Sequence, residues 1–187
     1  MKSRHSASLV LVWRIAEFEA RHLNASKIEP IHLLLGLCKV VDVDLPTLIS
    51  KEIPDRDEVL EESLREVRRL RTVFRVASVN AKALRRHLRR TSLEARFSFT
   101  ESERLRRSSA AKDVFADAEH FAQASNQPVY PVHLLYASLV AEDKDRDMTL
   151  ADLDISKRRL LNVTKRDALT FQVGPVSEAG GARTRWN

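Results

Sequence analysis

The sequence has very little glycine and a single cysteine. Of its four glycines, Gly36 alone lies before residue 174. Phosphate-binding loops need several glycines in the folded body, so the sequence predicts neither ATP binding nor an ATPase module. The lone Cys38 excludes an internal disulfide and a cysteine-cluster zinc site. We therefore expect a protein of a reducing compartment, the cytoplasm.

Long apolar runs are also missing. The run that begins at Leu9 stops at Trp13, and the charged residues Arg14 and Glu17 come directly after it. A signal peptide needs about 7–15 apolar residues and a membrane span about 20, so neither is expected. Hydrophobic residues still make up 43% of the chain, which is enough for a packed core.

What the sequence does contain is a helical period. Val12, Ala16 and Ala20 recur at the spacing of one helix face. After a polar connection, Pro30 suits the first turn of a new helix, whose residues are apolar on nearly all sides. The same pattern continues through the chain and predicts an all-α protein.

The pattern occurs twice. The segment from Pro30 to Leu35 reads Pro-Ile-His-Leu-Leu-Leu, and the segment from Pro131 to Tyr136 reads Pro-Val-His-Leu-Leu-Tyr. Each is preceded by a helix with a Val, Ala, Ala face and followed by a short helix, an acidic turn and a final helix. We expect the two copies to have the same helix order and no strand.

This repeat resembles the double repeat of the Clp N-terminal domain, which stands at the front of ClpA-, ClpB- and ClpC-type unfoldases. The family pattern appears in the first copy at Ala16, Glu19, Ala20, Leu23, Ile28, His32, Leu33, Leu34, Leu35, Gly36 and Leu37. The second copy keeps Ala118, Ala122, Val129, His133, Leu134 and Leu135. The resemblance implies two pseudo-symmetric repeats of about four helices each, packed as one all-α domain.

We expect four parts along the chain. Residues 1–90 form the first repeat with a basic helical extension, 91–107 a link, 108–173 the second repeat and 174–187 a flexible tail. The ATPase modules of the unfoldases have no counterpart in the sequence.

Catalytic chemistry has little support. His32 and His133 each sit in the first turn of a buried helix, and we interpret them as structural residues whose rings satisfy nearby backbone groups. Carboxylate or cysteine partners for a metal site are not supplied by the pattern. The sequence therefore predicts no metal, no cofactor and no enzyme activity.

The candidate partner-binding residues lie at the two repeated helix starts. Some members of the resembled family bind phosphoarginine through an acidic residue just before the repeat histidine. Ile31 and Val132 occupy those positions here, and neither can pair with a guanidinium group. We expect a more apolar docking groove formed by Ile31 and Val132, with Glu29 and Tyr130 beside them; the alternative is that both aliphatic residues belong to the core.

A second candidate is a basic face between residues 64 and 90, where arginine greatly outnumbers acidic residues. Its members are Arg65, Arg68, Arg69, Arg85, Arg86, Arg89 and Arg90. A solvated helix surface and a site for an acidic partner both fit this pattern.

Two functions remain. The resemblance favours a non-catalytic module that binds unfolded substrates, adaptors or a Clp chaperone–protease complex in protein quality control. The alternative is a nucleic-acid-associated or regulatory protein that uses the basic face.

Overall fold

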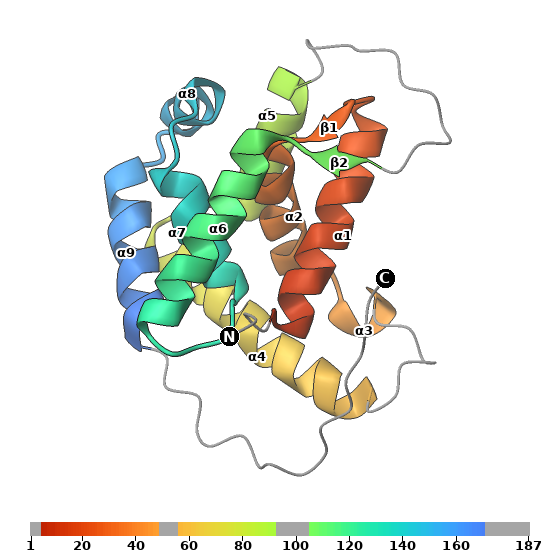
Figure 1. Cartoon of the computed structure of the whole chain (residues 1–187). Coiled ribbons are helices and arrows are strands. Elements are labelled where there is room, and N and C mark those ends of the chain that lie inside the picture. Colours follow the sequence, from red (N-terminus) through yellow and green to blue (C-terminus); the bar gives the residue numbers. More distant parts are fainter. Residues whose placement is uncertain (1–4, 49–55, 93–104, 171–187) are drawn as a thin grey trace.

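The computed structural model describes residues 5–48, 56–92 and 105–170 (Figure 1). Its helices are α1 Ala7–His22, α2 Pro30–Asp42, α3 Leu45–Leu48, α4 Arg56–Val76, α5 Ala81–Ser92, α6 Ser109–Ala124, α7 Pro131–Val140, α8 Lys144–Asp152 and α9 Lys157–Thr170. Two short strands, β1 Lys27–Ile28 and β2 Arg106–Arg107, complete the described elements. The predicted tail at 174–187 and most of the predicted link at 91–107 lie outside the described residues.

The all-α class and the repeated helix order are confirmed. Helices α1 to α4 and helices α6 to α9 follow one another in the same order, with α5 between the two sets. Matching local signals begin the helices. The Ser6 and Ser108 hydroxyls accept hydrogen bonds from the third residue of α1 and α6, and Pro30 and Pro131 occupy the first positions of α2 and α7.

The expectation of no strand was wrong. β1 and β2 pair in parallel, with Lys27 opposite Arg106 and Ile28 opposite Arg107. His5, just before α1, forms a matching bridge with Val129, just before α7. The segment before the first helix of each repeat thus pairs with the loop between the first two helices of the other repeat. This pairing gives hydrogen-bond partners to backbone N–H and C=O groups that lie outside the helices.

One core joins the two copies. Helix α2 packs against α1 and α7, while α4 packs against α9 and α5 against α8. The buried leucines of both copies belong to a single hydrophobic cluster. Burial of one such side chain contributes roughly 1.5–3 kcal/mol, so pairing the copies covers helix faces that neither could cover alone.

Helices α1 and α2 approach each other closely at Gly36. A Cβ added at Gly36 would lie 2.6 Å from the Val12 carbonyl oxygen. The close crossing therefore requires glycine at this position. The matching position of α7 is Ala137, so the corresponding crossing of α6 and α7 accommodates a side chain.

Candidate functional site

The two repeat histidines hold the starts of α2 and α7 in the same way. The Glu29 backbone N–H donates to His32 Nδ1 at 2.9 Å, and the Tyr130 backbone N–H donates to His133 Nδ1 at 3.0 Å. Burial lowers the pKa of both histidines to about 4, so both rings are neutral at neutral pH. Since Nδ1 is the acceptor, the proton of each ring is on Nε2.

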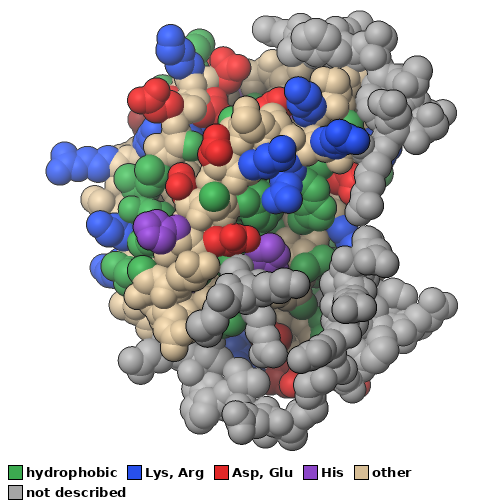
Figure 2. Space-filling view, viewed as in Figure 1, with side chains coloured by type: hydrophobic (Ala, Val, Ile, Leu, Met, Phe, Trp, Pro, Cys, Tyr) green, Lys and Arg blue, Asp and Glu red, His purple; other side chains and the backbone are tan. Residues whose placement is uncertain are grey.

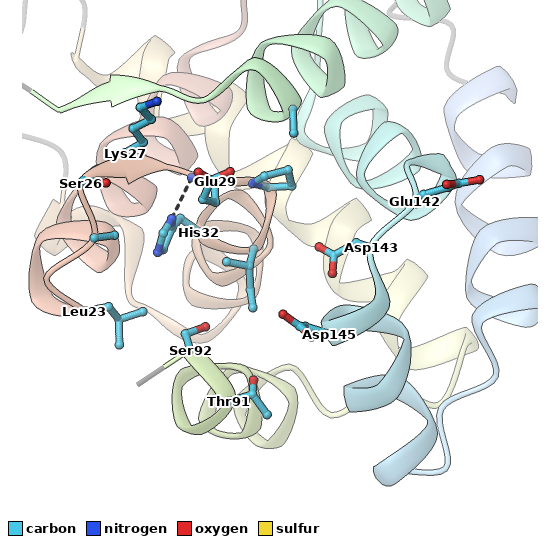
Figure 3. Close-up of a pocket in the computed structure, with 14 residues that line it drawn as sticks. Leu23, Ser26, Lys27, Glu29, His32, Thr91, Ser92, Glu142, Asp143 and Asp145 are labelled. Atoms are coloured by element: carbon cyan, nitrogen blue, oxygen red, sulfur yellow. Dashed lines mark hydrogen bonds between the residues drawn. The ribbon is translucent and has the colours of Figure 1, made fainter. Parts of the chain in front are cut away.

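A cavity of about 450 Å³ opens at the start of α2 (Figure 3). Its walls come from β1 and the first turn of α2, the last turn of α5, the start of α6 and the loop between α7 and α8. We call it the seam pocket, because both repeats contribute to it. Two of the predicted partner-binding residues, Glu29 and Ile31, line it and are half-buried.

Carboxylates are concentrated at one end of the seam pocket. Glu142, Asp143 and Asp145, which we call the acidic rim, come from the loop before α8 and its first turn. Asp143 caps α8 by accepting a hydrogen bond from the Arg146 backbone N–H at 2.9 Å. Glu142 and Asp145 are exposed.

The opposite end of the seam pocket is basic. Lys27 lines the pocket and pairs through its backbone with Arg106. Arg107 lies over two aromatic rings, with its guanidinium carbon 5.5 Å from the centre of the Trp13 ring and 5.3 Å from that of Phe115. We call Lys27, Arg106 and Arg107 the basic ridge; all three are exposed.

The matching start of α7 is closed. Tyr130 and Val132 are each 3% exposed. Tyr130 lies near the charges of Glu66 and Arg69 on α4, and burial is the main reason that its pKa is raised. The structure therefore brings Glu29 and Ile31 to a surface cavity, whereas Tyr130 and Val132 are buried at the start of α7.

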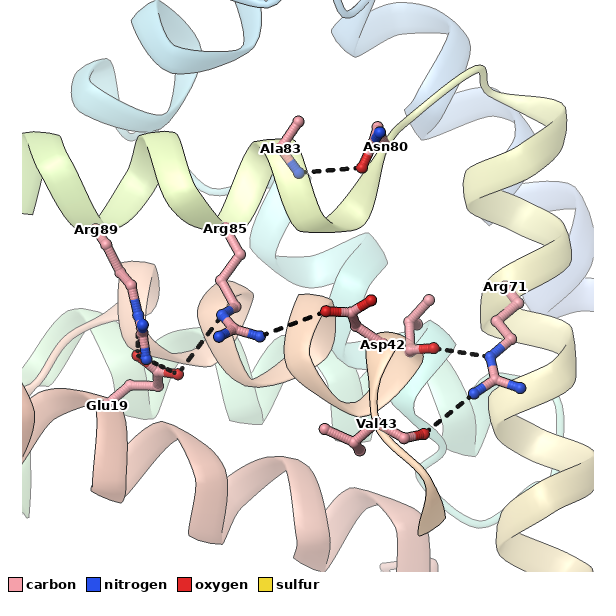
Figure 4. Close-up of polar contacts among 9 residues, drawn as sticks. Glu19, Asp42, Val43, Arg71, Asn80, Ala83, Arg85 and Arg89 are labelled. Atoms are coloured by element: carbon pink, nitrogen blue, oxygen red, sulfur yellow. Dashed lines mark hydrogen bonds and ion pairs between the residues drawn. The ribbon is translucent and has the colours of Figure 1, made fainter.

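Several arginines of the basic face form ion pairs with carboxylates of the same chain (Figure 4). Arg89 binds both oxygens of Glu19 at 2.7 Å, and Arg85 lies between Glu19 and Asp42. Glu19 is 1% exposed, so this arrangement offsets the desolvation of a buried charge. Arg69 pairs with Asp167 at 2.8 Å. Exposed members of the face are Arg65, Arg68, Arg86 and Arg90.

A buried polar cluster fixes the beginning of α1 to α4. Glu66 Oε2 accepts hydrogen bonds from the hydroxyls of Ser6, at 2.7 Å, and Ser8, while Oε1 has no hydrogen-bond partner among the described residues. Burial raises the pKa of Glu66 to about 7 against the opposing effect of the two hydroxyls. Glu66 therefore titrates near neutral pH.

Cys38 packs as a small hydrophobic residue. It is buried in α2, and burial raises the pKa of its thiol to about 12. A thiol held protonated in this way is a poor nucleophile. Within the part of the chain that the structure describes, no group of three or more His, Cys, Asp or Glu side chains is placed to hold a metal ion. In the same residues no helix has the length and hydrophobicity needed to cross a membrane.

Sequence reasoning missed the acidic rim and the basic ridge. Residues 142–145 were not singled out in the sequence, and Asp143 acts as the N-cap of α8. What makes the rim part of a site is the packing of α8 against α5, which places it opposite the start of α2. No local sequence signal reports that contact.

Comparison with known proteins supports the fold. No protein-family model matches the sequence, and no curated protein matches it. Among solved structures, the Hsp104 N-terminal domain from Candida albicans matches with a TM-score of 0.61 and 17% identity over 86% of this chain and 89% of that chain. A chain from structural work on a malarial protein secretion system matches with a TM-score of 0.62 and 17% identity, over 88% and 95%.

A third match is the N-terminal domain of the caseinolytic protease associated chaperone ClpD from Arabidopsis thaliana. Its TM-score is 0.51 at 16% identity, over 86% of this chain and 92% of that one. These structures share the order and packing of the helices across most of both chains. The described chain has the fold of the Clp N-terminal domains.

Proposed function

We propose that this protein is a non-catalytic binding module that docks a polypeptide segment in the seam pocket. Proteins whose solved domains share this fold include Hsp104 and a caseinolytic protease associated chaperone, which favours a partner from a chaperone or protease system. The observation that carries the proposal is the seam pocket itself. It lies at the one repeated helix start that is open, and it is lined by Glu29 and Ile31.

The chemistry of the pocket suits docking rather than catalysis. Its apolar surface comes from side chains such as Leu23, Pro30 and Ile31, which a partner's apolar side chain could cover. Its histidine is neutral and is held by the backbone, which leaves no activated base beside a nucleophile. The alternative function, nucleic-acid binding by the basic face, has less support because Arg69, Arg85 and Arg89 are engaged by carboxylates of the same chain.

The experiment is a titration with fluorescently labelled casein, used as an unfolded polypeptide probe. Replacing the exposed Ser26 at the pocket by tryptophan fills the cavity and should weaken binding about fivefold or more, which is a loss of about 1 kcal/mol. Lys82→Trp, on the exposed side of α5, is the matched control and should leave binding unchanged. Equal binding by wild type and Ser26→Trp would show that casein does not dock in the pocket.

A further inference from the structure

The two ends of the seam pocket carry opposite charge. Lys27 lines one end and its backbone pairs with that of Arg106 on β2, whereas the acidic rim lines the other end. Figure 2, viewed as in Figure 1, shows Lys and Arg side chains gathered over β1 and β2 and Asp and Glu side chains gathered in the region of α8. A ligand that spans the pocket therefore meets a positive potential at one end and a negative potential at the other.

Four of these charged residues form no ion pair within the described part of the fold. Glu142 and Asp145 form no ion pair with any described residue, and neither do Lys27 and Arg106. By contrast Arg85 and Arg89 on the neighbouring helix are both engaged by Glu19. Among the described residues, these charges of both signs at the pocket have no ion-pair partner, whereas Arg85 and Arg89 have one.

A histidine that can donate a hydrogen bond also lines the pocket. His32 is 3% exposed and lines the cavity. Its Nδ1 accepts from the Glu29 backbone N–H, so its Nε2 carries a proton that a ligand in the pocket could accept. A ligand that brings an acceptor to this N–H would gain a hydrogen bond. A backbone carbonyl oxygen is such an acceptor.

Resting on the proposed function, we infer that the seam pocket selects a polypeptide segment of mixed charge. A Lys or Arg side chain of the segment lies at the acidic rim, an Asp or Glu side chain lies at the basic ridge, and a backbone carbonyl between them accepts from His32 Nε2. A polyanion such as nucleic acid would be attracted by the basic ridge but repelled by the acidic rim at the other end of the pocket. Charge complementarity therefore favours a polypeptide over a nucleic acid.

The test uses four synthetic peptides of equal length and equal apolar content: one neutral, one basic, one acidic and one with a basic and an acidic end. Binding is followed by fluorescence anisotropy, and a single-stranded DNA oligonucleotide is titrated beside them. Wild-type protein should bind the mixed-charge peptide about tenfold more tightly than the neutral peptide, and this preference should shrink as salt is raised.

Charge-reversed variants separate the two ends. Glu142→Lys with Asp145→Lys, and separately Lys27→Glu with Arg106→Glu, should each weaken binding of the mixed-charge peptide about tenfold. The first variant should also gain affinity for the acidic peptide. Matched controls reverse exposed charges on other helices: Glu58→Lys with Glu62→Lys on α4, and Arg158→Glu with Lys165→Glu on α9. If reversal at the rim impairs folding, as thermal melting would reveal, Glu142→Gln with Asp145→Asn replaces it.

The outcomes separate this inference from the proposed function. If all four peptides bind equally well and Ser26→Trp weakens them all, the pocket is a docking site but charge selection is wrong. If no peptide binds, both proposals fail. DNA binding that is tighter than that of the mixed-charge peptide and is lost in Lys27→Glu with Arg106→Glu would overturn the inference and assign the ridge to nucleic acid.

Discussion

The two repeated helix starts have the same local structure and opposite surroundings. Both begin with proline, and both place a histidine whose Nδ1 accepts from the backbone N–H three residues earlier. Yet the residue before the first histidine, Ile31, lines an open pocket, while Val132 is 3% exposed in the core. A repeated motif therefore specifies how a helix begins and leaves open whether the start becomes surface or core.

The difference arises from what packs on each start. The start of α7 lies against α4, a helix of 21 residues whose Glu66 and Arg69 influence the charge state of Tyr130. The start of α2 has the end of α5 and the loop before α8 beside it, and these leave a cavity. One copy thus supplies core at the point where the other leaves a surface cavity.

The largest expected effect comes from placing a carboxylate at each start. Val132→Glu buries an unpaired carboxyl group and should lower the free energy of unfolding by about 3–5 kcal/mol, or prevent folding. Position 31 is half-buried in a pocket that is open to water, so Ile31→Glu should lower the free energy of unfolding by less than about 1.5 kcal/mol. Denaturant unfolding of the two variants measures the contrast, and equal losses would show that the two starts are equally buried.

The buried carboxyl groups of α4 and α9 allow a comparison by pH. Glu66 and Asp167 are each the eleventh residue of their helix, but Asp167 has Arg69 as an ion-pair partner and Glu66 has only hydroxyl partners among the described residues. The pKa of Glu66 is raised from 4.5 to about 7, so the folded state holds its proton more tightly than the unfolded state. The contribution of Glu66 to stability is present below about pH 4.5 and is lost as the pH rises from there through about 7, by up to about 3 kcal/mol.

Glu66→Gln should remove that loss. The pKa of His32 and that of His133 are lowered to about 4, so these residues have the opposite effect and stabilise the fold as the pH rises from about 4 to 6.5. The difference between wild type and Glu66→Gln, measured by urea unfolding at pH values from about 4 to 8, isolates the carboxyl group. A difference that does not change with pH would contradict the raised pKa.

The helix crossings give the next contrast. Gly36→Ala places a Cβ against the Val12 carbonyl oxygen and should lower the free energy of unfolding by about 1–3 kcal/mol, because α1 and α2 must separate. Ala137→Gly at the matching position of α7 removes a methyl group without a clash and should lower it by about 1 kcal/mol. Thermal melting of both variants tests this order. A stabilised Gly36→Ala protein would show that the crossing is looser than the structure places it.

The smallest expected contrast lies at the histidines themselves. His133→Leu leaves the buried Tyr130 N–H without an acceptor and should lower the free energy of unfolding by about 1–3 kcal/mol. His32→Leu should lower it by less than about 1 kcal/mol, because Glu29 is half-buried and water in the pocket can replace the ring nitrogen. Chemical denaturation of the pair decides the order, and a larger loss for His32→Leu would contradict it.

Only the local features of the two starts could be predicted from the sequence. The helix order and the proline starts were predictable because they depend on patterns within a few residues. Both histidine rings accept a hydrogen bond from a backbone N–H three residues earlier. The burial of Tyr130 and the partial exposure of Glu29 were not predictable, since the two positions share one motif and differ only in their distant neighbours. The ion pairs of Glu19 were not predictable either, because its partners Arg85 and Arg89 lie on a helix far along the chain.

The contrast between one open and one closed helix start is tested most sharply by a titration of isotope-labelled protein with the mixed-charge peptide, followed by backbone amide chemical shifts. We expect shifts at Ser26 to His32, at Thr91 and Ser92 and at Glu142 to Asp145, with Tyr130 to His133 unmoved. Shifts confined to Tyr130 to His133, or to the exposed arginines Arg68 and Arg86, with the seam pocket unmoved, would contradict the assignment of the start of α2 as the binding surface.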